Sequence, residues 1–151
     1  MSDALQTERL RLVRLDESFA EVHDEAECRA STRHWGEHGF GPWAILDDAG
    51  PFVGAAEVHF AHPGVTGIAT DEVEVGWTIS PALQNRGYAT EAMRAAIDDT
   101  WTRAHTDHLV AYIRPENAPS LRVAHKLGFT ARSQGLTRSG DPMTVYELRA
   151  P

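Results

Sequence analysis

The sequence EVEVGWTISPALQNRGYATEAMRAAIDDTW, residues 72–101, decides how the chain is read. Its first part alternates apolar and other side chains, which predicts a strand whose apolar positions are Val73, Val75, Trp77 and Ile79. Its last part spaces apolar side chains by three and four, which predicts a helix with one apolar face at Ala89, Met93, Ala96, Ile97, Thr100, Trp101 and Ala104. A glycine-bearing turn joins the two. Strand, turn and helix in this order expose free backbone N–H groups to an anion.

The length and composition of the chain favour one domain over residues 1–151. The net charge of −8 argues against a nucleic-acid partner and is compatible with a cationic substrate such as an amine. No apolar run approaches the roughly 20 residues that span a bilayer, so we expect no membrane segment. The N-terminus lacks the apolar core of a signal peptide, and Cys28 is a lone cysteine. We therefore expect a cytoplasmic protein without disulfides.

Elements on both sides of this stretch complete an α/β pattern. We expect strands near residues 8–15 (at a sheet edge), 42–46, 51–60, 108–114, 129–137 and 143–148. We expect helical segments near residues 19–30 and 118–127, and a short helix or irregular turn over residues 31–41. Asn117 or Ala118 would cap the helix that follows, with Pro119 in its first turn, and Gly128 would stop it.

The turn at residues 84–89 is a weak signal when taken alone, because a tight turn before a helix explains it equally well. Gly87 has no side chain to block a phosphate from reaching the backbone. The helix dipole adds roughly half a positive charge at that end, and Arg86 could add a full one. These features favour a phosphate-bearing ligand.

A second motif, IRPENAPSLRVAHKLGF at residues 113–129, narrows the ligand. Together with VEVGWTISPALQNRGYATEAM it resembles the GNAT acetyltransferase superfamily, and most closely its branch of ribosomal-protein N-terminal-amine acetyltransferases (RimJ/RimL-like). The segments RHWGEHGFGPWAI and TERLRLVRL are also similar to that branch. The resemblance therefore covers most of the chain.

The resemblance implies a mixed, mostly antiparallel central sheet of six to seven strands with helices on both faces. Strands four and five, here residues 73–79 and 108–114, would splay apart and hold acetyl-CoA. Backbone near Trp77, Thr78 and Ile79 would hold the pantetheine and polarise the thioester carbonyl. The pyrophosphate would lie on Gln84, Asn85, Arg86, Gly87, Tyr88, Ala89 and Thr90. Asn117 would contact the pantetheine or an ordered water.

Transfer of an acyl group to an amine needs a base, because an alkylamine is protonated at pH 7 and cannot attack a thioester in that state. Glu74 and Glu72 are candidates on one face of the predicted strand, and the resemblance favours Glu74. Glu57, on the neighbouring strand, is a second choice. The alternative is that Glu72 and Glu74 lie on a solvated face.

Ser120 matches the serine that in this branch protonates the leaving thiolate, although helix capping would also explain Ser120 and Asn117. Many GNAT enzymes carry a tyrosine one turn later as the general acid, and at that position this chain has Ala124 beside His125. His34 and His38 are four residues apart, as helical zinc ligands can be, but no recognisable ligand set accompanies them. We therefore expect no metal. Trp35, Phe40 and Trp43 either line an acceptor pocket or belong to the core.

These motifs predict direct acetyl transfer from acetyl-CoA to a primary amine, with a protein or peptide N-terminus as the favoured acceptor. A small amine, such as an amino acid, polyamine or aminoglycoside, is the alternative acceptor. The segment between the first strand and Pro42 has about 26 residues, roughly half of what the branch leads us to expect. This favours an open acceptor site or one completed by another subunit, hence a homodimer. It also leaves open a non-catalytic acyl-CoA sensor, or an interaction domain without coenzyme.

Overall fold

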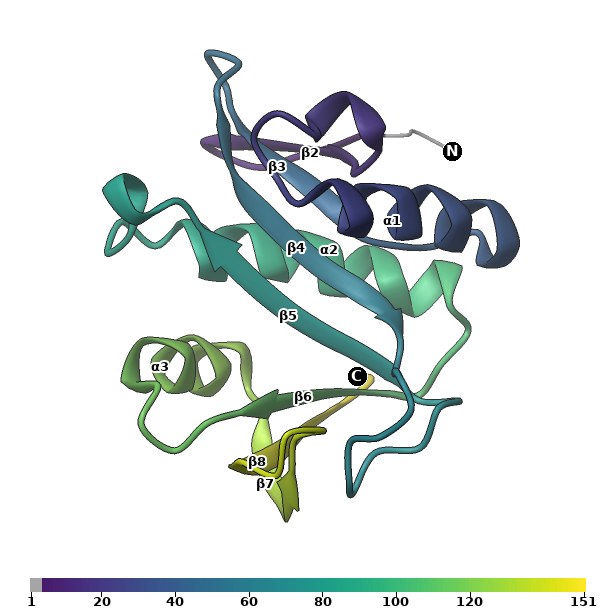
Figure 1. Cartoon of the computed structure of the whole chain (residues 1–151). Helices are drawn as coiled ribbons and strands as arrows, with labels where there is room; N and C mark the ends of the chain where they lie inside the picture. The colour runs from purple at the N-terminus through teal and green to yellow at the C-terminus, as the bar shows by residue number, and fades with distance from the viewer. Residues whose placement is uncertain (1–3) are drawn as a thin grey trace. The chain divides into compact units, whose positions relative to one another are not determined.

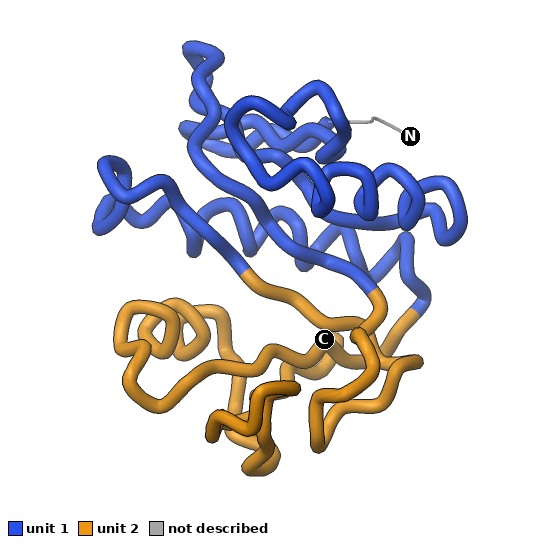
Figure 2. The backbone as a smooth tube through the Cα atoms, viewed as in Figure 1, with its two compact units in different colours: residues 1–59, 77–105 blue, residues 60–76, 106–151 orange. Residues whose placement is uncertain are grey.

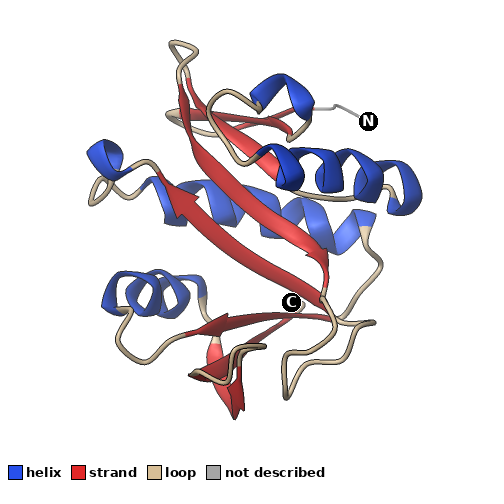
Figure 3. Ribbon diagram, in the orientation of Figure 1, coloured by secondary structure: helices blue, strands red, loops and turns tan. Residues whose placement is uncertain are grey.

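The computed structural model describes residues 4–151 and contains eight strands, three α-helices and two short 3-10 helices among them (Figures 1 and 3). In chain order they are β1 (Ala4–Gln6), β2 (Leu10–Arg14), η1 (Glu17–Phe19), α1 (Glu25–His38), β3 (Trp43–Asp47), β4 (Phe52–Phe60), β5 (Val73–Ile79), η2 (Pro81–Leu83), α2 (Tyr88–Arg103), β6 (His108–Ile113), α3 (Ala118–Leu127), β7 (Thr130–Leu136) and β8 (Pro142–Arg149). None of these helices has the length and apolar character needed to cross a membrane.

The strands follow the order β1-β2-β3-β4-β5-β6-β8-β7. The β5–β6 pairing is parallel and places Glu74 opposite Val110, whereas the pairings of β1 with β2, β2 with β3, β3 with β4, β6 with β8 and β7 with β8 are antiparallel. This is the mixed, mostly antiparallel α/β sheet that the sequence predicts. The splaying of β5 from β6 stays a prediction.

The prediction of six to seven strands is wrong by one, because β1 adds an eighth. Leu5 of β1 pairs with Leu12 of β2, so the strand expected at the sheet edge is in fact the second strand. A three-residue strand is too short to produce a detectable period of two, which is why the sequence pattern misses it.

The chain forms two compact units, shown in two colours in Figure 2. The first unit comprises residues 1–59 and 77–105, of which the structure describes residues 4–59 and 77–105. It contains β1 to β3, all of β4 except Phe60, the end of β5, α1 and α2. Within it, α1 lies in front of the strands and α2 behind them in Figure 1, so this part of the sheet has helices on both faces, as predicted. Leu10, Leu12, Ile45, Val53 and Met93 are fully buried in its core.

The second unit comprises residues 60–76 and 106–151 and contains the start of β5, β6, α3, β7 and β8. Val110 and Val145 pack with Ala61 and Ile68 in a core cluster. The ends of α3 follow the sequence prediction: Asn117 caps its start, and Gly128, with φ of 95°, ends it in the left-handed conformation that glycine tolerates best. The prediction of one domain over the whole chain stays a prediction.

The N-terminal helical region differs from the sequence prediction. The sequence predicts separate elements at residues 19–30 and 31–41, but one helix, α1, runs from Glu25 to His38. The Asp24 side chain accepts a hydrogen bond from the Glu27 N–H, which sets the start of the helix. Gly39, with φ of 74°, ends the helix. The segment before Asp24 forms only the 3-10 turn η1. Weak apolar periodicity in this region hides the position of the helix start.

Candidate functional site

The turn between η2 and α2 lies in the first unit, and its first residue, Gln84, uses its backbone N–H to bond the Pro81 carbonyl oxygen at 3.4 Å. Gly87 is the N-cap of α2 with φ of 80°, and it has no side chain that could cap the helix. The first hydrogen bond at this helix end runs from the Glu91 N–H to the Gly87 carbonyl oxygen, at 3.1 Å. The N–H groups of residues 88–90 are therefore not used within α2. Residues 84–87 are exposed, so an anion can reach this helix end.

Arg9, from the turn before β2, holds this segment in place. Its Nη1 donates to the Arg86 carbonyl oxygen at 2.9 Å, and its guanidinium lies 4.6 Å from the centre of the Tyr88 ring. Its Nε donates to Glu91 Oε1 at 2.7 Å, while Glu91 Oε2 accepts from the Thr7 hydroxyl at 2.5 Å. Burial favours a higher pKa for Glu91, but the bonds from Thr7 and Arg9 outweigh it and lower that pKa. Sequence reasoning missed Arg9 and Glu91, because no local pattern links residues about 80 positions apart.

The end of β5, where Trp77, Thr78 and Ile79 are predicted to hold pantetheine, lies close against β4. A Cβ on Gly54 would stand 2.0 Å from the Thr78 carbonyl oxygen, so only glycine fits there. The Gln84 side-chain amide donates to the Ile79 carbonyl oxygen at 3.0 Å. Thr78 is exposed and Trp77 is half-buried. The side chain of Gln84 thus supports the strand end, its backbone N–H donates to the Pro81 carbonyl oxygen at 3.4 Å, and its expected phosphate contact stays a prediction.

The two carboxylates predicted for the β5 region have different environments, both within the second unit. Glu74 is 8% exposed, so it does not lie on a solvated face. The Glu72 carboxylate accepts from Arg132 at 2.6 Å and from His108 Nε2 at 2.8 Å. The bond from Arg132, more than any other contact, lowers the pKa of Glu72 to about 2. A carboxylate that is so weakly basic cannot serve well as a base, which leaves Glu74 as the candidate on β5. Its catalytic role stays a prediction.

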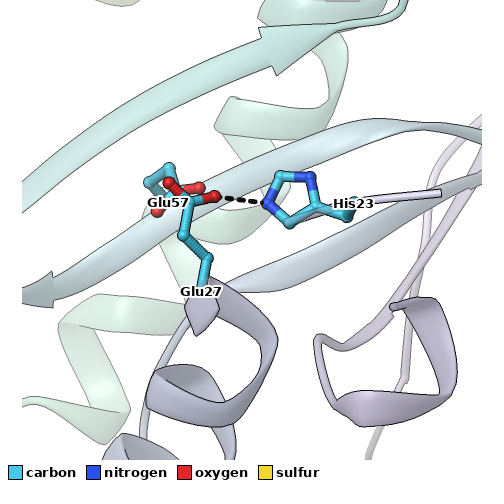
Figure 4. Close-up of side chains that lie close together, drawn as sticks. All are labelled: His23, Glu27 and Glu57. Atoms are coloured by element: carbon cyan, nitrogen blue, oxygen red, sulfur yellow. Dashed lines mark ion pairs between the residues drawn. The ribbon is translucent and has the colours of Figure 1, made fainter. Parts of the chain in front are cut away.

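Glu57, the second choice as base, is half-buried on β4 in the first unit. Burial raises its pKa most, the negative charge of Glu27 raises it further, and His23 opposes the shift. The Glu57 Oε2 atom lies 3.9 Å from His59 Nε2. Figure 4 shows that Glu27, from α1, and His23, from the segment before it, converge on Glu57. Sequence reasoning did not connect His23 and Glu27 with Glu57.

Asn117 and Ser120 form the start of α3. The Ser120 N–H donates to Asn117 Oδ1 at 3.2 Å, so the capping interpretation of Asn117 is confirmed. That bond uses the Ser120 amide and not its hydroxyl, which leaves the predicted acid role of the hydroxyl compatible with the cap. Ala124, at the position where many related enzymes carry a tyrosine, is buried, and His125 is exposed.

The remaining candidate side chains are three aromatic residues, Cys28 and the pair of His34 and His38. Trp35, Phe40 and Trp43 are at most 5% exposed, which confirms that they belong to the core. Cys28 is fully buried, and burial followed by the nearby Asp16 raises the pKa of its thiol, so it is not an activated nucleophile. The rings of His34 and His38 lie 4.5 Å apart. The metal-ligating side chains that come together in residues 4–151 are two other groups, namely His23, Glu27 and Glu57, and Glu72, His108 and Glu147.

Comparisons with known proteins identify the family. The family model described as "Acetyltransferase (GNAT) domain" matches residues 6–130. An uncharacterized N-acetyltransferase of Bacillus subtilis, YnaD, is 40% identical over 55 residues, which are 36% of this chain and 32% of that protein. The uncharacterized protein YkkB, also from Bacillus subtilis, is 32% identical over 78 residues, which are 52% of this chain and 45% of that protein. The chain thus matches about a third to just under half of the length of these relatives.

Solved structures agree along nearly the whole chain. A Bordetella pertussis protein provisionally assigned to the GnaT family has a TM-score of 0.82 at 28% identity and covers 99% of this chain and 100% of its own. An acetyltransferase from Agrobacterium tumefaciens has a TM-score of 0.77 at 26% identity, and the match covers 99% of this chain and 96% of that protein. RimJ from Mycobacterium smegmatis, solved in complex with CoA-disulfide, has a TM-score of 0.72 at 20% identity, covering 93% and 82%, and supports the fold alone. Fold, helix-end geometry and the family match agree: the chain belongs to the GNAT acetyltransferase family.

Proposed function

We propose that the chain is an acetyl-CoA-dependent N-acetyltransferase that acts on a primary amine. The observation that carries the proposal is the exposed, uncapped start of α2, where Gly87 stands in the left-handed conformation and Arg9 holds the turn. Backbone N–H groups of residues 85–90 bind the pyrophosphate of the coenzyme there, and Gln84, whose N–H donates to the Pro81 carbonyl oxygen, supports the turn. Backbone of Trp77, Thr78 and Ile79 binds the pantetheine, and Asn117 contributes through its amide while it caps α3.

The chemistry requires one proton acceptor and one proton donor. Bound acetyl-CoA supplies a thioester whose carbonyl carbon is open to attack by an amine nitrogen. Glu74 takes the proton of the substrate ammonium, directly or through water, and so frees the nitrogen lone pair. A C–N bond forms, the C–S bond breaks, and the Ser120 hydroxyl gives a proton to the departing thiolate. The second proton, which the nitrogen loses as it becomes an amide, restores the Ser120 hydroxyl. The transfer takes place with both substrates bound, because holding them in a reactive pose supplies much of the rate.

The proposed acceptor is a protein or peptide N-terminus. This finer assignment is supported by structural neighbours such as RimJ and a ribosomal-protein-S5-alanine acetyltransferase from Vibrio fischeri, both at or below 20% identity. A small amine remains the alternative acceptor, and a homodimer stays a prediction. The acidic balance of the chain favours a cationic acceptor of either kind.

Thiol release from acetyl-CoA over a panel of peptides, amino acids, polyamines and aminoglycosides tests the activity, and mass spectrometry locates the acetyl group. We expect Glu74→Gln and Ser120→Ala to lower kcat at least roughly tenfold while CoA affinity stays unchanged. Glu72→Gln is the matched control two residues earlier, just before β5, and it should keep kcat because that carboxylate is bound to Arg132. Glu57→Gln tests the second base candidate.

The outcomes separate the alternatives. Turnover that neither Glu74→Gln nor Ser120→Ala slows tenfold overturns the two assigned roles, and a selective loss in Glu57→Gln moves the base to β4. Micromolar CoA binding, about −8 kcal/mol, without turnover of any amine favours the sensor. An interaction domain without coenzyme would show no CoA binding in calorimetry.

A further inference from the structure

Three side chains from separate parts of the first unit meet beside β4 (Figure 4). His23 precedes α1, Glu27 belongs to the first turn of α1, and Glu57 lies in the middle of β4. One ligand atom from each residue lies within 4.8 Å of the other two, and His23 Nε2 is 2.7 Å from a Glu27 oxygen. The fold, and not local sequence spacing, therefore brings one imidazole and two carboxylates to a common point.

His23 presents its Nε2 atom to this point in an unusual state. The atom has no contact with solvent and makes no hydrogen bond, because the nearby Glu27 oxygen does not meet hydrogen-bond geometry. The His23 backbone N–H donates to the Phe19 carbonyl oxygen at 2.9 Å, and the centre of the His23 ring lies 6.0 Å from that of the Phe52 ring. The atom therefore faces a carboxylate oxygen at 2.7 Å without a well-directed hydrogen bond, whereas buried polar atoms normally have one.

The second group of one imidazole and two carboxylates differs from the first because an arginine lies among its side chains. Glu72, His108 and Glu147 surround the Arg132 guanidinium, which donates to both carboxylates at 2.6 and 3.1 Å. Among residues 4–151, the carboxylates of Glu27 and Glu57 form ion pairs with histidine and with no arginine or lysine. Two neighbouring carboxylates that are partly removed from water repel one another unless a cation lies between them. The second group contains a permanent cation, the Arg132 guanidinium, whereas the first group contains no arginine or lysine.

We propose that His23, Glu27 and Glu57 bind one divalent first-row transition-metal cation, with Zn²⁺ as the reference ion. One imidazole and two carboxylates form a borderline ligand set that suits Zn²⁺ and its neighbours better than Mg²⁺. Zinc bonds to nitrogen and oxygen of about 2.0–2.2 Å place tetrahedral ligands roughly 3.4 Å apart. The present separations, from 2.7 Å to under 4.8 Å, lie on both sides of that value. Glu27 is 56% exposed and can adjust, and water completes the coordination.

The bound ion links the start of α1 to β4. No hydrogen bond between side chains of residues 23–27 and β4 supplies that connection at present, as far as residues 4–151 show. A ligand that binds the folded chain and not the unfolded chain stabilises the fold by mass action. The metal is thus expected to anchor the N-terminal helical segment, independently of acetyl transfer.

Calorimetric titration of the chelator-treated full chain with ZnCl₂ at pH 7.5 tests the proposal. We expect one site with a Kd in the micromolar range or tighter, and binding at least tenfold weaker in His23→Gln and Glu57→Gln. Glu25→Gln is the matched control, because Glu25 is also in the first turn of α1 but pairs with Arg29 on the exposed surface. His38→Gln tests binding at the His34–His38 pair.

Two further measurements keep the result clear if a variant is unstable. Without metal, Glu57→Gln should resist urea at least as well as the wild type, because the change removes a partly buried charge. X-ray absorption of the zinc-loaded wild type should report one imidazole with oxygen ligands. The proposal is overturned if the wild type binds no zinc or if Glu57→Gln binds zinc as tightly as the wild type. It is also overturned if only Glu25→Gln or His38→Gln loses binding, or if the spectrum reports two or more imidazoles.

Discussion

At the scale of single residues, Gly54 has the strictest steric requirement. A Cβ there would meet the Thr78 carbonyl oxygen at 2.0 Å and the Ile79 Cα at 3.0 Å, and backbone atoms cannot swing aside as a flexible side chain can. We expect Gly54→Ala to lower the free energy of unfolding by about 1–3 kcal/mol, measured by urea denaturation. Coenzyme affinity should fall as well, because the displaced backbone is the proposed pantetheine contact.

Gly36 provides the control for that change. It lies inside α1, and an added Cβ would have no neighbour within 4 Å. Gly36→Ala should therefore raise the free energy of unfolding by about 0.5–1 kcal/mol, since alanine loses less backbone freedom in a helix. If both alanine variants change stability in the same direction, the close approach of β4 to β5 is not the cause.

The lowered pKa of Glu72 predicts how the free energy of unfolding depends on pH in the acid range. Its pKa is lowered from 4.5 to about 2, chiefly by Arg132. A lowered pKa in the folded state stabilises the fold above the unfolded value and ceases to do so as the pH falls through the folded value. The free energy of unfolding of the wild type should therefore drop between pH 4.5 and 2. Glu72→Gln should lose this part of the slope, and Glu25→Gln, on the exposed face of α1, should keep it.

The pKa of His108 is shifted in the opposite direction to that of Glu72. The bond to Asp107, followed by the bond to Glu72, raises its pKa above 6.5. Its contribution is complete below pH 6.5 and is lost as the pH rises through the raised value. The network around Arg132 should therefore stabilise the second unit most between about pH 4.5 and 6.5. We expect the urea midpoint of His108→Gln to fall less steeply than that of the wild type as the pH rises above 6.5. Equal pH dependence of the two midpoints would contradict this assignment.

At the scale of elements, the start of α2 depends on the turn before β2. Arg9 reaches Arg86, Tyr88 and Glu91. We expect Arg9→Gln to raise the Kd for CoA several-fold in calorimetry, because the turn loses its support and the binding backbone must be ordered by the ligand. Stability should change by less than about 1 kcal/mol, since Arg9 is 44% exposed and exposed ion pairs contribute little.

Arg11, two residues along on β2, is the matched control for charge. It is exposed, and among residues 4–151 no hydrogen bond or ion pair joins its side chain to the turn before α2. Arg11→Gln should therefore leave the Kd for CoA unchanged. Equal Kd values for the wild type, Arg9→Gln and Arg11→Gln would show that the turn needs no outside support.

At the scale of the whole molecule, the prediction of one domain can be measured. All four tryptophans, Trp35, Trp43, Trp77 and Trp101, belong to the first unit, so tryptophan fluorescence reports on that unit alone. Far-UV circular dichroism reports on both units. Because β5 runs through both units without a break, we expect the two signals to share one urea midpoint. Two separated midpoints would establish two independently folding parts.

The sequence by itself determined the order of the main elements. Seven of the eight strands and the helices at residues 88–103 and 118–127 follow from alternation, three-four spacing, Asn117 and Gly128, because these are local signals. The turn with Gly87 and the motif at residues 113–129 were enough to predict the family. Local patterns failed at β1, which is too short, and at the start of α1, where the apolar spacing is weak.

Only the tertiary structure decided the environment of each candidate group. Glu72 and Glu74 are equivalent in the sequence, yet one is bound to Arg132, 60 residues away, and the other is buried opposite Val110. Glu57 was a lone carboxylate until the fold brought His23 and Glu27 to it. The physical reason is that burial and charge, which set the pKa and the ligands of a group, depend on distant parts of the chain.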